Sequence, residues 1–177
     1  AEMIPSDLSD FNLYGGLYRY VNLVYTPAVS VGSLQITPEV PASKRGVLNI
    51  TGRFYNPTDV KTASVSVEIE NPQGEVVASR QMDSVVPLGD FRVEDIEIQK
   101  PVWWHVDAPK LYTCRVSVTA DGQTWVSTER FGFRTYEFQE KGPFFLNGER
   151  LLLRGTHRHE DHAGVGGNSL VSRWFGR

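Results

Sequence analysis

The sequence predicts an all-β protein whose central part is a β-sandwich of immunoglobulin type. Apolar and polar residues alternate in several short stretches between positions 28 and 135, as half-buried antiparallel strands require. Turn-forming residues separate these stretches at regular intervals, and no stretch repeats apolar residues at helical spacing. Many short strands with turns between them are typical of two sheets packed face to face.

Three stretches show the alternation most clearly, and we expect their apolar residues to form the core. These residues are Leu48, Ile50 and Phe54, then Val65, Val67 and Ile69, then Tyr112, Cys114, Val116 and Val118. Turn residues break the chain between the strands because they favour backbone conformations that a strand cannot adopt. The predicted turns lie at Asn56-Pro57, Asn71 to Gly74, Pro87 to Asp90 and Asp121-Gly122.

Two irregularities are predicted within the sandwich. The apolar alternation slips by one residue between Val93 and Ile96, which indicates a β-bulge. Tyr112 stands near the start of a strand, in the arrangement of a tyrosine corner. Trp103 and Trp104 precede it and are interpreted as large core or interface side chains, with a sugar-stacking platform as the alternative.

Composition excludes several classes of protein. The chain is 40% hydrophobic and 22% charged, as in globular proteins, and its net charge of −3 gives no support for a nucleic-acid or anionic-membrane partner. No stretch is long enough for a membrane span. The single Cys114 cannot form an internal disulfide and is expected in the core, so the compartment, cytoplasmic or periplasmic, stays open.

One stretch, Phe144 to Gly166, has the pattern of a site. The turn pair Asn147-Gly148 is followed by the apolar run Leu151 to Leu153, which leads into a cluster of ionisable residues. The cluster comprises His157, Arg158, His159, Glu160, Asp161 and His162. A buried strand that ends in such a loop often forms part of a catalytic face, because the strand fixes the position and the loop supplies the chemistry.

The histidines of this cluster admit more than one interpretation. On a strand His157 and His159 would point to one face, where Glu160 or Asp161 could complete a divalent metal site. The spacing is not that of the zinc-protease helix, whose histidines lie four residues apart. A hydrogen-bonding role and a solvated loop remain as the other readings, and we predict no metal at these residues.

Several motifs together resemble a known family. Phe131 to Arg134, Phe144 to Gly148, Arg154-Gly155 and Arg158 to Glu160 resemble the junction in glycoside hydrolase family two, the β-galactosidase and β-glucuronidase family. There an immunoglobulin-like domain leads into a catalytic (β/α)8 barrel. The chain departs from the family pattern at Thr156 and His157.

The resemblance implies three parts. Residues 1–27 would end a sugar-binding jelly roll, and Gly15 to Val21 match its closing strand. Residues 28–135 would be the sandwich. Residues 136–177 would begin a truncated barrel. After Gly166 the resemblance ends, and Gly167 to Arg177 is expected to be a truncated or frame-shifted end, with a cloning scar as the alternative. We expect the segment after Tyr136 to be mobile or packed opportunistically on the sandwich, because the supports that a complete barrel gives to Leu151 to Leu153 are missing.

The function implied by the resemblance is retaining hydrolysis of terminal β-galactosides, which uses one glutamate as nucleophile and another as acid and base. Both glutamates would lie beyond the end of this chain, so the fragment alone is predicted to be inactive. Asp10 and His159 match substrate contacts of the family, and His157, Glu160 and His162 are candidate site-lining residues. The alternative for Asp10 is an aspartate that caps a surface turn.

The predicted partners follow from the same resemblance. The partner of the longer protein would be a β-galactoside sugar. The fragment would hold no cofactor. The longer protein would use a divalent cation, with sodium as a further candidate. A homo-oligomer is expected. The competing hypothesis is a β-sandwich module that acts by itself in carbohydrate binding or as a structural unit.

Overall fold

A computed structural model describes residues 17, 20–41, 45–157, 161–162 and 166–167. The chain divides into two units, Tyr25–Leu152 and the pair of terminal segments Ala1–Val24 and Leu153–Arg177. The described residues contain strands and turns and no helix, which confirms the prediction of an all-β protein. The described residues therefore include no helix that could span a membrane.

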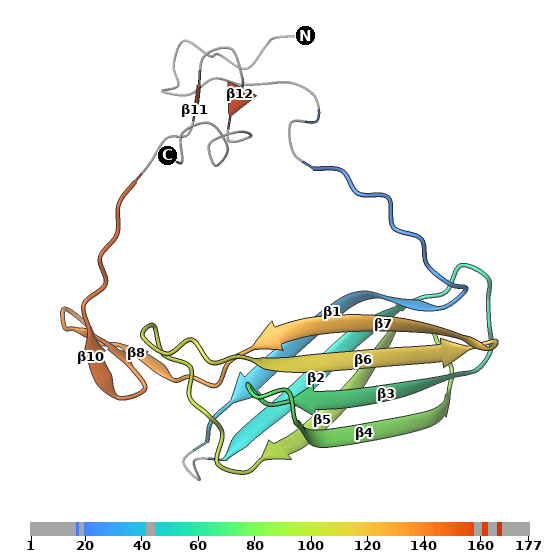
Figure 1. Cartoon of the computed structure of the whole chain (residues 1–177), viewed down its shortest axis with the longest axis horizontal. Helices are drawn as coiled ribbons and strands as arrows, with labels where there is room; N and C mark the ends of the chain where they lie inside the picture. The colour runs from blue at the N-terminus through green and yellow to red at the C-terminus, as the bar shows by residue number, and fades with distance from the viewer. Residues whose placement is uncertain (1–16, 18–19, 42–44, 158–160, 163–165, 168–177) are drawn as a thin grey trace. The chain divides into compact units, whose positions relative to one another are not determined.

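Two antiparallel sheets form the sandwich (Figure 1). The first sheet has the order β1 (Ser30–Glu39), β2 (Gly46–Tyr55), β5 (Asp90–Ile98). The second has the order β4 (Val76–Val85), β3 (Ala63–Glu70), β6 (Tyr112–Ala120), β7 (Gln123–Phe131). The predicted immunoglobulin-like sandwich is therefore confirmed. One strand differs from a constant-type immunoglobulin domain: there the fourth strand lies beside the fifth, whereas here β4 pairs with β3 on the other sheet.

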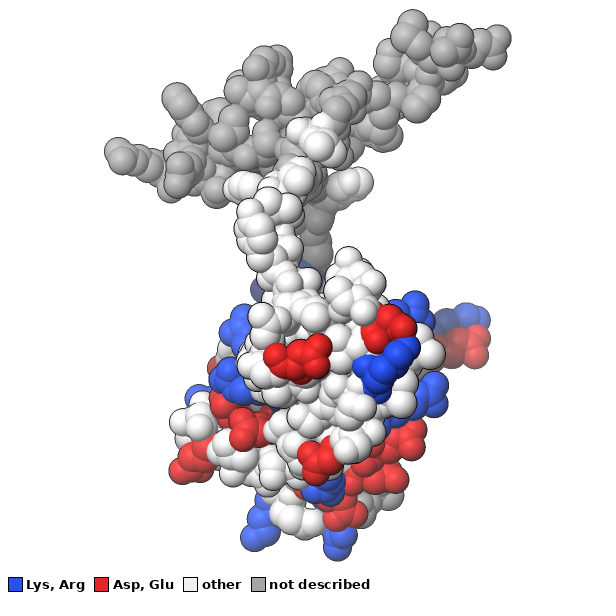
Figure 2. All heavy atoms as spheres, turned by 90° about the vertical axis from the view of Figure 1, so that its right-hand side faces the viewer, with Lys and Arg blue, Asp and Glu red and all other residues white. Residues whose placement is uncertain are grey.

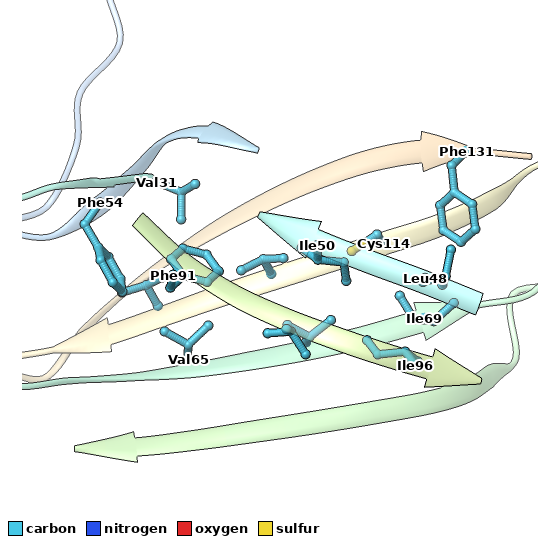
Figure 3. Packing of buried hydrophobic residues seen from close by; sticks show 14 of the residues in the cluster. Val31, Leu48, Ile50, Phe54, Val65, Ile69, Phe91, Ile96, Cys114 and Phe131 are labelled. Carbon is cyan, nitrogen blue, oxygen red and sulfur yellow. The ribbon is translucent and has the colours of Figure 1, made fainter. Parts of the chain in front are cut away.

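The core lies between the two sheets and consists of the alternating residues that the sequence predicted (Figure 3). Leu48, Ile50, Val65 and Ile69 are wholly inaccessible to solvent, and the residues that alternate with the buried ones on β2 and β3 are partly or fully exposed. Burial of a leucine or isoleucine side chain stabilises a fold by roughly 1.5–3 kcal/mol. The period of two thus sets the register of both sheets, because a slip of one residue would expose this face.

The predicted bulge is present in β5. Leu48 pairs with Ile96 and Ile50 pairs with Val93, so β5 carries one more residue than β2 across this interval. Asp95 adopts a left-handed conformation with φ of 55°, and its backbone N–H donates to the side-chain oxygen of Asn49 at 3.1 Å. The extra residue lets both Val93 and Ile96 face the core.

A third, smaller sheet follows the sandwich within the same unit. It has the order β10 (Glu149–Leu151), β9 (Phe144–Leu146), β8 (Tyr136–Phe138). The turn between β9 and β10 has φ of 54° at Asn147 and 82° at Gly148, both in the left-handed region that an Asn-Gly pair tolerates. The segment after Tyr136 therefore has paired strands as far as Leu151, which the sequence did not predict.

Beyond Leu151 the described structure is sparse. Leu152 and Leu153 are exposed at 66% and 60%, and a two-residue ladder joins β11 (Asp161–His162) to β12 (Gly166–Gly167). The predicted (β/α)8 barrel and the predicted domain boundaries stay predictions.

Figure 2 shows acidic and basic side chains interspersed over one face of the molecule, without a large field of a single sign.

Candidate functional site

Only some of the predicted site residues lie within the described part of the chain. Asp10, His159 and Glu160 lie outside the described residues. His157 is exposed, and its backbone carbonyl accepts a long hydrogen bond of 3.5 Å from the Thr156 hydroxyl. The backbone of His162 belongs to β11 and pairs with Gly166. The roles assigned to these residues therefore stay predictions.

The described residues also provide no metal centre. Within the ranges given above, no group of three or more His, Cys, Asp or Glu side chains is placed to hold a metal ion. The metal alternative for the histidine cluster depends on His159 and Glu160, which lie outside those ranges. Both the hydrogen-bonding role and the metal-binding alternative remain open for these two residues.

A groove of about 480 Å³ lies at the end of β7. Its lining comprises Pro38, Trp104, Leu111, Arg130, Phe131, Gly132, Arg134 and Tyr136. The guanidinium of Arg134 stands over the Trp104 ring, 5.1 Å from the ring centroid. This cation–π contact covers one face of the indole, so that face is unavailable for stacking on a sugar.

The electrostatics of the groove favour anions. Arg130 and Arg134 both line it, no carboxylate does, and neither arginine forms an ion pair within the part of the chain that the structure describes. The groove can therefore attract an acidic group, but it lacks the pair of carboxylates that double displacement at an anomeric carbon requires. Its residues fit a binding role and do not fit catalysis.

Cys114 is the one thiol of the sequence and a possible nucleophile by residue type alone. It is fully buried in β6, and this burial, assisted by the negative charge of Glu129, raises the pKa of its thiol to about 12. A thiol with this pKa stays protonated at neutral pH, and the thiolate is the nucleophilic form. Cys114 therefore has a structural role, as the sequence predicted.

Two features of this unit were missed by the sequence analysis. One is the Arg134–Trp104 contact, and the other is a set of hydrogen bonds from Asn147 to Thr135 and Trp104. The Asn-Gly pair predicted the turn, but not the partners of the asparagine side chain, because those partners come from distant parts of the chain. Unusual residue types beside a strand end, here Trp-Trp and Arg-Thr, were the only available signal.

Comparisons with known proteins agree with the geometry of the sandwich. The model of the family described as "Glycosyl hydrolases family 2" matches residues 29–134. The crystal structure of Parabacteroides merdae β-glucuronidase is similar with 52% identity and a TM-score of 0.85, over 93% of this chain and 21% of that one. The structure of Bacteroides uniformis β-glucuronidase 3 is similar with 48% identity and a TM-score of 0.76, over 93% and 20%.

A curated relative has a different named activity. The β-galactosidase of Thermoanaerobacter pseudethanolicus is 30% identical over 161 residues, which are 90% of this chain and 21% of that protein. The chain thus spans about a fifth of the length of the relatives that it matches. The matched segment includes the sandwich.

Proposed function

The chain belongs to glycosyl hydrolases family 2, and on that premise we propose that it is part of a longer retaining β-glycosidase. In that proposal the unit Tyr25–Leu152, which contains the sandwich and the sheet β8–β10, is a non-catalytic part of the enzyme. A retaining enzyme needs a nucleophilic carboxylate and a second carboxyl group as acid and base. The longer protein would supply both.

The observation that carries this proposal is the 52% identity to Parabacteroides merdae β-glucuronidase over 93% of this chain. It favours a β-glucuronide as substrate of the longer protein. The 30% identical β-galactosidase supports the β-galactoside expected from the sequence motifs, and it makes that sugar the second candidate. The two sugars differ in charge, because a glucuronide carries a carboxylate where a galactoside carries a neutral hydroxymethyl group.

We assign substrate contacts to Asp10 and His159 in this enzyme, with His157, Glu160 and His162 as residues lining the site. These assignments rest on the motif resemblance. A side chain at the carboxyl end of a barrel strand faces the active site, which is where the resemblance places His159. The divalent cation, the sodium ion and the homo-oligomeric state expected of the longer protein are proposals too.

A second candidate function follows from the groove beside β7. Two arginines, an indole and no carboxylate line it, which suits the binding of an acidic saccharide by the sandwich itself. In this alternative the chain acts as a carbohydrate-binding module. Calorimetric titration of the 177-residue chain with glucuronic acid and with galactose separates the two hypotheses, because only the module would bind glucuronic acid saturably.

The experiment that tests the main proposal compares two proteins. The longer protein and the 177-residue chain are purified and assayed with 4-nitrophenyl β-glucuronide and 4-nitrophenyl β-galactoside. We expect turnover of at least one substrate by the longer protein and none above background by the short chain. Absence of turnover of both substrates by a folded longer protein would refute the proposed activity, and turnover by the short chain would refute the assignment of both carboxylates to the missing part.

A further inference from the structure

Asn147, in the turn between β9 and β10, makes three hydrogen bonds, and one of them reaches the connection between β5 and β6 of the sandwich. The backbone N–H of Asn147 donates to the carbonyl of Thr135 at 2.8 Å, and its side-chain oxygen accepts from the N–H of Thr135 at 3.0 Å. Its side-chain amide nitrogen donates to the carbonyl of Trp104 at 2.9 Å. The Asn147 side chain therefore bonds both to Thr135, which directly precedes β8, and to Trp104, which lies 43 residues away in the sequence.

The residue type is required by both the backbone and the bonds. Asn147 has φ of 54°, a left-handed conformation that asparagine tolerates better than most residues other than glycine. Glycine would tolerate the conformation but has no side chain to bond. Aspartate would keep the acceptor for the Thr135 N–H but, while ionised, would turn an oxygen toward the Trp104 carbonyl oxygen.

The segment that Asn147 holds is itself fixed to the sandwich. The N–H of Trp104 donates to the carbonyl of Phe133 at 2.9 Å, and Arg134 covers its ring. Gly132 lies so close that a Cβ atom there would stand 2.8 Å from the Cβ of Trp104. Phe133 is fully buried in the core. The carbonyl that accepts from Asn147 is thus anchored through the extension of β7.

Apolar burial does little to hold the small sheet in place. Every residue of β8 is exposed, with Tyr136 at 65% and Phe138 at 72%. Leu146 is the one fully buried side chain of the sheet, and it does not belong to the cluster of buried residues between the two large sheets. Among the described residues, the bond from the Asn147 amide to the Trp104 carbonyl is the hydrogen bond that connects this sheet to the rest of the unit.

We infer that Asn147 is a positioning residue that fastens the sheet β8–β10 to the end of the sandwich. It thereby fixes the point at which the chain leaves β10 at Leu151 and continues to His159. The catalytic consequence of this inference rests on the proposed function, because the chain beyond Leu151 leads to the residues assigned to the sugar. The fastening itself can be measured on the 177-residue chain.

The first test is amide hydrogen exchange on that chain. Asn147→Gly keeps the turn conformation and removes both side-chain attachments, so protection of the amides in β9 and β10 should fall about tenfold or more, with β3 and β6 unchanged. The matched control is Asn71→Gly. The Asn71 side chain makes three hydrogen bonds, at 2.8–2.9 Å, against two for the Asn147 side chain, but its partners are only Gln73 and Glu75 within its own turn. It should leave β9 and β10 protected.

Asn147→Asp gives a signature that a general loss of stability would not. The ionised carboxylate cannot donate to the Trp104 carbonyl, whereas the protonated acid carries one O–H donor. Protection factors in β9 and β10 should therefore be low at pH 7 and rise as pH falls through the titration of the new carboxyl group, while Asn147→Gly at the same pH shows no rise. Unchanged protection in Asn147→Gly, or an equal loss throughout the sandwich, would overturn the inference.

The second test uses the longer enzyme. Asn147→Gly should lower kcat by about tenfold with a smaller effect on KM, because misplaced contacts reduce the fraction of bound substrate in reactive geometry. Asn71→Gly should leave both constants within about twofold of the parent, as a substitution remote from any site does. Lost protection with unchanged kinetics would overturn the positioning role. A longer parent protein without activity would instead refute the proposed function. In that case the exchange test alone would show whether Asn147 fastens the sheet β8–β10.

Discussion

The hydroxyl of Tyr112 accepts a hydrogen bond from the backbone N–H of Val102 at 2.9 Å. Tyr112 is only 2% exposed, and its ring stacks on Phe131 at a centroid distance of 5.5 Å and meets Phe133 edge-on at 5.2 Å. The bond therefore ties the connection between β5 and β6 to the core. It confirms the tyrosine corner that the sequence predicted.

The Tyr112–Val102 bond leads to the first prediction. Tyr112→Phe keeps the buried ring and removes only the acceptor of the Val102 N–H, so the free energy of unfolding should fall by about 1 kcal/mol. Urea denaturation followed by tryptophan fluorescence measures the change. Tyr55→Phe is the control, because the Tyr55 side chain is 52% exposed and should contribute almost nothing. Equal stability of the two variants would contradict a structural role for the corner.

A close approach between Phe91 and Gly52 leads to the second prediction. A Cβ atom at position 52 would lie 2.2 Å from the Cζ atom of Phe91, which is a core residue. Gly52→Ala forces the ring or the strand to move, and overpacking of this kind costs about 1–3 kcal/mol. We therefore expect a clearly lower melting temperature for Gly52→Ala.

Gly32→Ala is the matched control for Gly52→Ala. A Cβ atom at Gly32 would have its nearest neighbour at 3.7 Å, which is ordinary van der Waals contact, and Gly32 also lies on a strand of the same sheet. Differential scanning calorimetry on both variants separates the steric effect from the general preference of strands for residues other than glycine. A melting temperature that falls equally in both variants would rule out the ring contact as the cause.

The alternation of apolar residues was sufficient to predict the sandwich. Period two predicted the inward faces of β2, β3 and β6, and a slip in that period predicted the bulge beside Asp95. These features depend on residues near one another in the sequence. The attachment of Asn147 to Trp104 could not be predicted in this way, because it joins positions 43 residues apart. The placement of β4 depends equally on a long-range choice between two sheet edges.

The candidate site was less accessible to prediction for a physical reason. A site loop is assembled by the elements around it, and the cluster from His157 to His162 carries no periodicity that would reveal its partners. Its spacing alone allowed metal binding, hydrogen bonding or solvation. The motif resemblance supplied a role for His159, and the described residues neither add a contact for it nor remove one.

The third prediction concerns the buried thiol. Because burial raises the pKa of Cys114 to about 12, the folded chain keeps the proton that the unfolded chain releases at lower pH. The thiol contributes stability that is fully present below the unfolded pKa, of about 8.5, and is lost as pH rises through the folded value. Stability should therefore fall with rising pH between about 9 and 12, and less steeply in Cys114→Ala.

Thiol reactivity offers an independent measurement of the same residue. Native chain at pH 8 should react with Ellman's reagent only as fast as it unfolds, while chain in 6 M guanidinium chloride should react at once, as an exposed cysteine does. The stability difference between the parent chain and Cys114→Ala is followed by urea denaturation at several pH values. Rapid labelling of the native chain would show that Cys114 is accessible and would contradict the assigned burial.

The last prediction concerns His159 in the longer enzyme. If its imidazole contacts the sugar, His159→Ala should lower kcat/KM by an amount equivalent to about 2–4 kcal/mol, because a hydrogen bond that strengthens in the transition state is lost. Far-ultraviolet circular dichroism and the melting temperature should stay near those of the parent. His105→Ala serves as control, since His105 lies in the sandwich unit and the described contacts of its Nδ1 atom are with Asp107 alone, whose N–H lies at 3.3 Å and whose Oδ2 lies at 3.5 Å. Kinetics of His159→Ala that match those of His105→Ala would assign the histidine cluster to a solvated loop, because a sugar contact cannot be removed without a cost in transition-state binding.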